Sequence, residues 1–556
     1  MERIWMKNWP TRVPTKLHYS LGEKPLHEYL HHHAEEKPDQ SAYIFYGTSI
    51  SWQELDRYSD SLACYLQRQG VQKGDRIGIY MQNCPQYMIA HYAIQKIGAI
   101  VSPFNPMSKE AELAYMVEQI NAKGIITGQE LYPFVKAVKD KSENLEIVVT
   151  TNYLDFLSEG TILPIPEEVS MEKQTFEEAE DLLDIIRTYQ PNFEAVPINI
   201  WEDVSLMVFT SGTTGRPKAA MLTYGNALFK TASTFEANGL NYEDRSVAVM
   251  PLCHIAGMVM GVNLPVYSGS TSVLLTRFEP ETVITAMEQY KPQNWYSIVP
   301  MNMAILHHPG IETRDLTSLN RNMCTSFGMP ITQDLVNQWK KVTEGCQLHE
   351  AAYGLSETHT CDTFMPADNV KLGSCGIPTH ETDIRIVDLE SGEDLPTDKE
   401  GEIAVKNPGV FKGYWNRPEA TAETLRDGWV FTGDIGYIDG EGYLYFSGRV
   451  KEMIKSSGYS VFPEDVEALL IDHKAIAQVA VIGVPDEKKG ESVKAFVVLH
   501  PQYKGKISET EIVDWAKEKM AAYKYPRYVE FLQSVPATGS GKVLRRLLKE
   551  EVRANE

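Results

Sequence analysis

The sequence predicts an α/β protein with a large N-terminal domain, which includes a small antiparallel β subdomain, and a small α+β C-terminal domain. Strand and helix patterns alternate over residues 50–106 and again over 200–310, as they do in parallel sheets covered by helices. Over residues 383–448 short alternating runs separated by Gly and Asp take their place, which is typical of an antiparallel sheet. A chain of 556 residues is also too long for one hydrophobic core.

The first α/β alternation can be followed element by element. Ser51 and Glu54 form a capping box that begins a helix, and Gly70 ends it. A strand, a helix and a second strand are then expected in DRIGIYM (75–81), PQYMIAHYAIQKIG (85–98) and AIVSPFNP (99–106). The acidic segment 158–190 is poor in strand-forming residues, so we expect a surface excursion there.

The C-terminal part of the chain forms a unit of its own. QVAVIGV and VKAFVVL have strand patterns, and a capping box at Ser508 and Glu511 begins a helix. The boundary is expected near Gly448–Lys451, which divides the chain into domains 1–448 and 449–556.

Composition and charge restrict the class of function. A net charge of −22 repels phosphate backbones, which argues against nucleic acid as a partner. Seven cysteines without a C-x-x-C pair indicate a reducing, cytoplasmic setting. No apolar run approaches the length of a membrane-spanning helix, although peripheral membrane contact and a homodimer are compatible with the sequence. The histidines at 31–33 are expected at a surface helix end, because consecutive helical side chains diverge too far to share one metal ion.

The segment VFTSGTTGRPK (208–218) has the residues of an anion-binding loop. Its glycines permit the backbone conformations that aim successive N–H groups at one anion, its hydroxyls add donors, and Lys218 adds a charge. It departs from the G-x-x-x-x-G-K-[ST] phosphate loop because its second Gly comes early and Ala219 follows the Lys. Taken alone, the segment is compatible with either a phosphate loop or a polar turn.

Further segments follow it at characteristic spacing. They are AAYGLSE (351–357), DGWVFTGDIGYID (427–439), GRVKEMIKSSGYSVFPEDVE (448–467) and PATGSGKVLRRLLK (536–549), with KIGAIVSPFNP (96–106) ahead of them. Together with VFTSGTTGRPK, this series resembles the adenylate-forming superfamily, which includes acyl- and aryl-CoA synthetases, luciferases and peptide-synthetase adenylation domains. Ala219 and Gly448 depart from the resembled pattern, which has Gly and, in many members, Asp at these positions.

The resemblance implies a reaction in two steps that uses ATP, Mg²⁺ and coenzyme A. A small-molecule carboxylic acid attacks the α-phosphate of ATP to give acyl-AMP and pyrophosphate, and the thiol of coenzyme A then takes the acyl group. The small C-terminal domain is implied to be mobile and to rotate between the steps about Lys451. No protein nucleophile is required, and electrostatic stabilisation by Mg²⁺ and cations carries the first step.

The resemblance also implies a role for individual residues. Lys542, Glu357 and Thr210 are implied as catalytic residues, and Glu357 and Thr210 also as Mg²⁺ ligands. Gly458 and Lys455 are implied to lie along the coenzyme A path. The implied ATP and AMP contacts are Ser211, Gly212, Thr213, Thr214, Gly215, Lys218, Tyr353, Gly354, Ser356, Asp434 and Arg449. The implied acyl-pocket residues are His254, Phe327, Gly328 and Met329.

The acid is expected to be a medium- to long-chain fatty acid. The segments that match the family's acyl-specificity regions are rich in Met, Ile, Val and aromatic residues (251–261, 295–306 and 325–331), and Met adapts to flexible chains. The N-terminal segment also resembles the leader of bacterial fatty-acyl-CoA synthetases. The alternatives are an aryl-acid CoA ligase, an adenylating enzyme that passes the acyl group to a carrier protein, and a silent nucleotide-binding regulator on the same fold.

Overall fold

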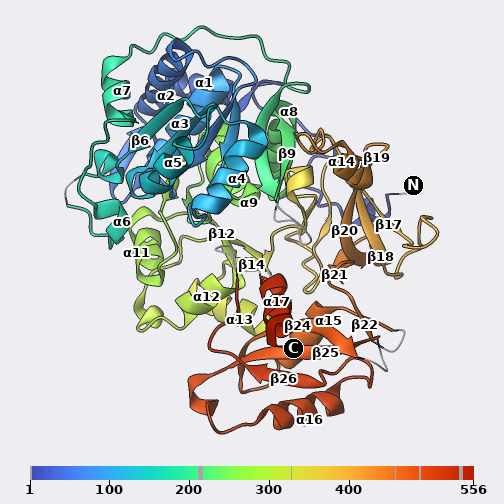
Figure 1. Cartoon of the computed structure of the whole chain (residues 1–556). Coiled ribbons are helices and arrows are strands. Elements are labelled where there is room, and N and C mark those ends of the chain that lie inside the picture. Colours follow the sequence, from blue (N-terminus) through green and yellow to red (C-terminus); the bar gives the residue numbers. More distant parts are fainter. Residues whose placement is uncertain are drawn as a thin grey trace.

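The computed structural model describes residues 3–158, 160–210, 217–326, 329–456, 459–486, 490–537 and 543–555. Two seven-stranded sheets with helices on their faces form most of the chain. An antiparallel sheet lies beside them, and a separate unit at the bottom of Figure 1 contains the C-terminal residues. These two helix-covered sheets, the antiparallel sheet and the C-terminal unit confirm the predicted fold class.

The first large sheet has the strand order β7-β6-β5-β3-β4-β8-β9 and is parallel except for β9 at its edge. Its strands are β3 (Arg76–Tyr80), β4 (Ile100–Pro103), β5 (Gly124–Gly128), β6 (Ile147–Thr151), β7 (Glu180–Asp181), β8 (Val204–Thr210) and β9 (Lys218–Thr223). The predicted strands at 75–81 and 99–106 are β3 and β4.

The second large sheet has the order β14-β13-β12-β10-β11-β1-β2, again with one antiparallel edge strand, β2. Its strands are β1 (Ser41–Phe45), β2 (Thr48–Ser51), β10 (Ser246–Ala248), β11 (Ser272–Leu274), β12 (Asn294–Ile298), β13 (Arg321–Thr325) and β14 (Gln347–Glu350). In such sheets, ligand-binding residues collect outside the carboxyl ends of the parallel strands.

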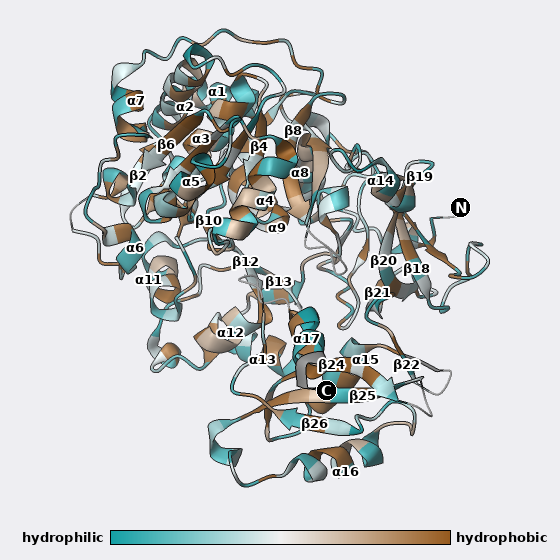
Figure 2. Cartoon of the chain, in the orientation of Figure 1, coloured by the Kyte–Doolittle hydropathy of each residue, from teal (hydrophilic) through white to brown (hydrophobic). Residues whose placement is uncertain are grey.

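Helices cover both large sheets, and two of them are buried almost completely. Every residue of α3 is buried, as is nearly every residue of α8, because one hydrophobic core joins these helices to strands of both sheets. Figure 2 shows the apolar strands beneath helices with hydrophilic outer faces. The helices of these layers are α1 (Leu26–Glu36), α2 (Trp52–Arg68), α3 (Pro85–Lys96), α4 (Glu110–Ile120), α5 (Tyr132–Lys139), α6 (Glu167–Ser170), α7 (Leu182–Thr188), α8 (Tyr224–Ala237), α9 (Ile255–Met258), α10 (Leu264–Ser268), α11 (Pro280–Tyr290), α12 (Val299–Leu306) and α13 (Gln333–Val342).

The antiparallel sheet predicted for residues 383–448 is present, and the N-terminal segment packs beside it. Trp5, in the 3-10 helix η1 (Ile4–Asn8), is buried against Tyr443 and neighbouring apolar residues, and Arg3 pairs with Asp383 at 2.8 Å. The elements of this region are β15 (Thr363–Phe364), β16 (Ile377–Pro378), β17 (Asp383–Val387), β18 (Gly401–Lys406), α14 (Pro418–Thr424), β19 (Leu425–Arg426), β20 (Trp429–Ile438) and β21 (Leu444–Arg449).

The C-terminal unit has its own sheet and hydrophobic core. The two predicted strands form its central hairpin, β24–β25. The capping box of Ser508 and Glu511 is present at the start of α16. The elements are β22 (Ile454–Ser456), β23 (Tyr459–Val461), α15 (Pro463–Leu470), β24 (Ile476–Asp486), β25 (Gly490–Leu499), α16 (Glu509–Lys519), β26 (Tyr528–Phe531) and α17 (Arg545–Asn555).

Two local expectations differ from the structure. His33 does not lie on the surface: its side chain is buried and its Nε2 lies 2.9 Å from the Val266 carbonyl oxygen, because α1 packs against α10. The segment 158–190 is also more than a surface excursion, since β7 extends the first sheet and Ile185 and Ile186 of α7 are buried. Within the described residues, no helix is long and apolar enough to cross a membrane.

Candidate active site

The predicted phosphate loop connects β8 and β9 at the edge of the first sheet. Thr210 ends β8 and Lys218 begins β9. The two residues pair across the hairpin, with Thr210 Oγ1 donating to the Lys218 carbonyl oxygen at 3.4 Å. Ala219 lies within β9 with its side chain buried, so a strand residue replaces the family's Gly without strain. Five predicted loop residues lie outside the described part of the chain: Ser211, Gly212, Thr213, Thr214 and Gly215.

Lys218 shares its surroundings with an aromatic ring and a carboxylate. Its Nζ lies 4.1 Å from the centroid of the Tyr414 ring, a cation–π geometry. The Tyr414 hydroxyl donates a hydrogen bond to Glu357 Oε1 at 2.5 Å. Burial lowers the pKa of Lys218, and the Glu357 carboxylate opposes that shift. A cation, a ring and an anion thus form one contiguous group.

Glu357 is held by the loop that follows β14. It lies in the 3-10 turn η6 (Ser356–Thr358), and its carbonyl oxygen accepts a hydrogen bond from the Phe411 N–H at 2.9 Å. Gly354 lies just before this turn, and a Cβ there would lie 2.5 Å from the Cys361 backbone nitrogen. The loop therefore closes on itself so tightly that position 354 needs glycine.

Tyr353, Asp434 and Arg449 form a second group. The Tyr353 hydroxyl donates to Asp434 Oδ2 at 2.8 Å, and Arg449 Nε lies 2.8 Å from Asp434 Oδ1. Asp434 and Arg449 face each other across β20 and β21. Burial opposes the charge on Arg449, but Asp434 and its neighbours Tyr353, Glu452 and Glu357 together outweigh burial, and the pKa of Arg449 is raised. Burial also raises the pKa of Tyr353, so the tyrosine stays a neutral donor.

The predicted hinge segment lies next to these groups. Lys451 is exposed in the turn between β21 and β22, and its charge contributes to lowering the pKa of Lys218. Lys455 is exposed in β22, where its backbone N–H donates to Glu491 Oε2 at 2.8 Å. Two predicted residues of this domain, Gly458 and Lys542, lie outside the described residues.

Arg545 lies within the predicted catalytic-lysine segment (536–549), at the start of α17, and contacts three carboxylates. It pairs with Glu464 at 2.8 Å, with Glu467 at 2.7 Å and with Glu452, which comes directly after Lys451. Burial raises the pKa of Glu464 to about 7. One guanidinium beside three carboxylates makes this cluster sensitive to protonation.

The predicted acyl-pocket residues follow carboxyl ends of strands in the second sheet. His254 is the N-cap residue of α9, after β10, and its Nδ1 accepts a hydrogen bond from the Ala256 N–H at 3.4 Å. Met329 follows β13 and packs against the main hydrophobic core. Phe327 and Gly328 lie outside the described residues.

A buried carboxyl group lies beside this segment. Glu350, the last residue of β14, accepts a hydrogen bond from the Ser326 N–H through Oε1 at 3.3 Å. Burial raises its pKa to about 7, so Glu350 is largely neutral below pH 7 and becomes charged as the pH rises through 7. A neutral group is compatible with a substrate carboxylate nearby, whereas a charged one would repel it.

Sequence reasoning missed Tyr414 and Glu350. Tyr414 lies in the stretch FKGYWN (411–416), between strand patterns, where its only signal is a cluster of Gly and aromatic residues. Glu350 looks like the end of a buried strand, and only its unfavourable burial as a carboxyl group marks it.

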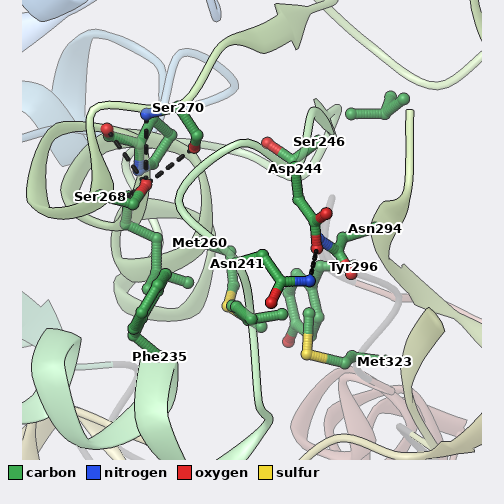
Figure 3. A pocket seen from close by; sticks show the side chains of 14 residues that line it. Phe235, Asn241, Asp244, Ser246, Met260, Ser268, Ser270, Asn294, Tyr296 and Met323 are labelled. Atoms are coloured by element: carbon green, nitrogen blue, oxygen red, sulfur yellow. Dashed lines mark hydrogen bonds between the residues drawn. The ribbon is translucent and has the colours of Figure 1, made fainter. Parts of the chain in front are cut away.

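A narrow cavity of about 40 Å³ lies deeper in the second sheet. Figure 3 shows side chains from α8, the segment before β10, the π-helical turn η4 (Val259–Asn263) and three strands around it. The lining residues are Phe235, Leu240, Asn241, Asp244, Ser246, Val247, Met260, Leu264, Pro265, Ser268, Ser270, Asn294, Tyr296 and Met323.

Comparison with known proteins identifies the family. Residues 30–415 match the AMP-binding enzyme model, and residues 465–542 match the AMP-binding enzyme C-terminal domain. A long-chain-fatty-acid–CoA ligase of Bacillus subtilis is 35% identical over 100% of this chain and 99% of that protein. A feruloyl-CoA synthase of Amycolatopsis is 34% identical over 94% of this chain and 97% of that protein.

The fold agrees with these sequence matches. The crystal structure of the anthranilate CoA ligase AuaEII in complex with anthranoyl-AMP superposes with a TM-score of 0.84 at 25% identity, and the match covers 96% of this chain and 98% of that one. Both family models match in chain order, and the first of them alone spans more than half of the sequence. The chain therefore belongs to the AMP-binding enzyme family.

Proposed function

We propose that this protein is an ATP-dependent, AMP-forming acid:CoA ligase whose acid is a medium- to long-chain fatty acid. The observation that carries the proposal is the pair of neighbouring groups formed by Lys218, Tyr414 and Glu357 and by Tyr353, Asp434 and Arg449. The first offers a cation and an anion for a metal–triphosphate, and the second offers an aromatic face and a carboxylate for a nucleoside.

In the first step the acid carboxylate attacks the α-phosphorus of ATP. A bond forms between the carboxylate oxygen and phosphorus, and the bond from phosphorus to the bridging oxygen of pyrophosphate breaks. Lys218 and the loop 210–218 would hold the outer phosphates, while Asp434 would accept hydrogen bonds from the ribose hydroxyls. Lys542 would bring a further cation to the reacting phosphate. Fixed charges that match the transition state supply the acceleration.

The residues present fit a magnesium ion carried by the triphosphate. Among the described residues, no cluster of three or more His, Cys, Asp or Glu side chains could hold a metal by itself. Mg²⁺ commonly binds through one or two carboxylates together with substrate phosphates and water. Glu357 and the Thr210 hydroxyl would supply the protein ligands, and Mg²⁺ would offset the phosphate charges.

The second step requires the thiol of coenzyme A to reach the acyl carbonyl. The thiolate sulfur forms a bond to the carbonyl carbon, and AMP leaves with the electrons of the carbon–oxygen bond. We propose domains 1–448 and 449–556, with the second rotating about Lys451 so that Lys542 withdraws and the segment with Lys455 and Gly458 approaches the thiol. Such hinge closure is common where one site serves two reactions.

A fatty acid is favoured because methionine and aromatic side chains line the inner cavity. A second candidate is an aryl acid, since a relative of similar identity is named feruloyl-CoA synthase. Pyrophosphate release, with and without coenzyme A, over C8–C16 fatty acids and benzoate- or coumarate-type acids tests the choice. Equal or better turnover of the aryl acids would overturn the fatty-acid assignment.

The same assay tests the remaining alternatives. Pyrophosphate release that forms acyl-AMP but does not depend on coenzyme A would indicate a carrier protein or an amine as the acceptor. Lys542→Ala should abolish adenylation while the fold is kept, and undiminished adenylation would remove the proposed role of that lysine. A cytoplasmic location, peripheral membrane contact and a homodimer remain proposals, of which the first is supported by seven free cysteines.

A further inference from the structure

The inner cavity lies at the opposite end of the second sheet from the proposed catalytic groups. Asn294 begins β12 and Ser246 begins β10, whereas Ile298 and Thr325 end β12 and β13 on the side of the active site. Because these strands are parallel, the cavity opens near their amino ends. An acyl chain that reaches it must cross the face of the sheet.

Apolar side chains separate the cavity from the active site. Tyr296 and Met323 belong to both the cavity wall and a cluster that continues to Ala351, two residues before Tyr353. Met260 packs against the same cluster from η4, a type of helical turn that often occurs at functional sites. Methionine side chains rearrange easily, so this stretch can open for an alkyl chain and close without one.

The strand length sets the chain length that would reach the cavity. From Ile298 to Asn294 the strand advances about 13 Å, at about 3.3 Å per residue. An extended alkyl chain advances about 1.3 Å per single bond, so about ten bonds span this length of strand on the face of the sheet. About ten bonds join about eleven carbons, so with about three to five further carbons between the strand ends and the carboxyl group, a chain of roughly fourteen to sixteen carbons would place its ω-end in the cavity.

The far wall of the cavity is polar and rich in hydrogen-bond acceptors. Asp244 Oδ2 accepts from Asn294 Nδ2 at 2.9 Å and from Asn241 Nδ2 at 3.2 Å, and Figure 3 shows these side chains together at one side of the cavity. Asn294 Oδ1 is buried and has no hydrogen-bond partner among the described residues. Asn241 is exposed, so this wall borders solvent.

An unsatisfied buried acceptor is unfavourable unless a donor reaches it. An ω-hydroxyl could donate to Asn294 Oδ1 or to Asp244. An ω-carboxylate would meet the negative charge of Asp244 and bring no donor. An ω-ammonium would have to pass the apolar stretch as an ion, which is costly. The wall therefore favours a neutral hydrogen-bond donor.

We propose that the substrates include ω-hydroxylated long-chain fatty acids, whose terminal hydroxyl binds at Asp244 and Asn294. This inference rests on the proposed acid:CoA ligase function and adds a second recognition point at the far end of the chain.

The test compares hexadecanoate, 16-hydroxyhexadecanoate and hexadecanedioate in coenzyme A-dependent pyrophosphate release. We expect kcat/KM for the hydroxy acid to equal or exceed that for hexadecanoate, and the value for the diacid to be at least tenfold lower. Asp244→Asn should raise the ratio of diacid to hexadecanoate turnover at least fivefold. Glu243→Gln, a neighbouring exposed residue that does not line the cavity, is the matched control and should leave the ratio unchanged.

The results distinguish failure of the proposed ω-hydroxyl recognition from failure of the proposed acid:CoA ligase function. If hexadecanoate is a good substrate but the hydroxy acid is tenfold worse, the ω-recognition is wrong while the ligase assignment stands. If Asp244→Asn and Glu243→Gln change the ratio of diacid to hexadecanoate turnover equally, the inference is also overturned. If no acid of any length supports turnover, the proposed function itself fails.

Discussion

Replacing Lys230 by Met tests how the loop that carries Glu357 is held in place. Lys230 Nζ lies 2.6 Å from Asp362 Oδ1, and both side chains have an exposed fraction of 0%. Asp362 also accepts hydrogen bonds from Asn407 Nδ2 at 2.8 Å and from the hydroxyl of Thr358. Because Thr358 shares the turn η6 with Glu357, the buried ion pair ties this turn to α8.

The size of the effect follows from the burial. Lys230→Met leaves the Asp362 carboxyl buried without its cation, and breaking such a pair costs about 3–5 kcal/mol. Burial already raises the pKa of Asp362, so protonation of the variant limits the loss but does not remove it. The unfolding entropy is about 2.1 cal/mol/K per residue, so a unit of about 450 residues should lose about 3–5 °C in Tm.

Thermal unfolding and ATP kinetics measure the two consequences. The Tm of the Lys230→Met variant should fall by that amount, and its KM for ATP with Mg²⁺ should rise because the turn that carries Glu357 is less firmly held. The double variant Lys230→Met, Asp362→Leu removes both charges and should recover at least half of the lost Tm. A single variant with unchanged Tm, or a double variant no more stable than the single one, would refute the reasoning.

Three further predictions follow from groups around the site. Tyr414→Phe removes the hydroxyl that donates to Glu357 and should lower kcat/KM in pyrophosphate release about tenfold or more, since a hydrogen bond to a charged group contributes about 1.5–3 kcal/mol; unchanged activity would contradict this. Burial raises the pKa of Glu350 to about 7, so its ionisation should raise the KM for the acid between about pH 7 and 8.5. If the KM for the acid depends on pH in the same way in the parent and in Glu350→Gln, this prediction is wrong. Burial raises the pKa of Glu464, beside Arg545, from 4.5 to about 7, so its contribution to folding stability is complete below about pH 4.5 and is lost as the pH rises through about 7. The Tm of the C-terminal unit should therefore fall between pH 5 and 8, and Glu464→Gln should flatten that dependence, as melts at constant ionic strength can show.

The sequence predicts helix starts and strands correctly where residues close together in the chain determine them. The capping boxes at Ser51 and Ser508 form as expected, because each needs only residues three apart. The strands β3, β4, β24 and β25 were predicted from alternation and short apolar runs. His33 was placed wrongly because nothing near it in sequence indicates that α10 covers that face of α1.

Motifs in the sequence predict individual residues of the site, but they do not predict which of these residues pair or which residues outside the motifs join them. Asp434 and Arg449 lie in separate predicted segments, and their pairing depends on the register of β20 and β21. Lys230 and Asp362 are 132 residues apart, and no spacing rule joins a helix interior to a distant loop. Tyr414 was missed for the same reason, because only the folded chain brings it between Lys218 and Glu357.

The packing of the N-terminal helix η1 has a consequence for synthesis. Trp5 packs against Tyr443, and Lys7 Nζ donates to the carbonyl oxygen of Gly440 at 2.5 Å, although Gly440 is translated 433 residues after Lys7. Domains generally fold in order as the chain emerges. The residues of η1 must therefore wait, with an exposed tryptophan, until the antiparallel sheet that they pack beside has been translated, and they take their places late in folding.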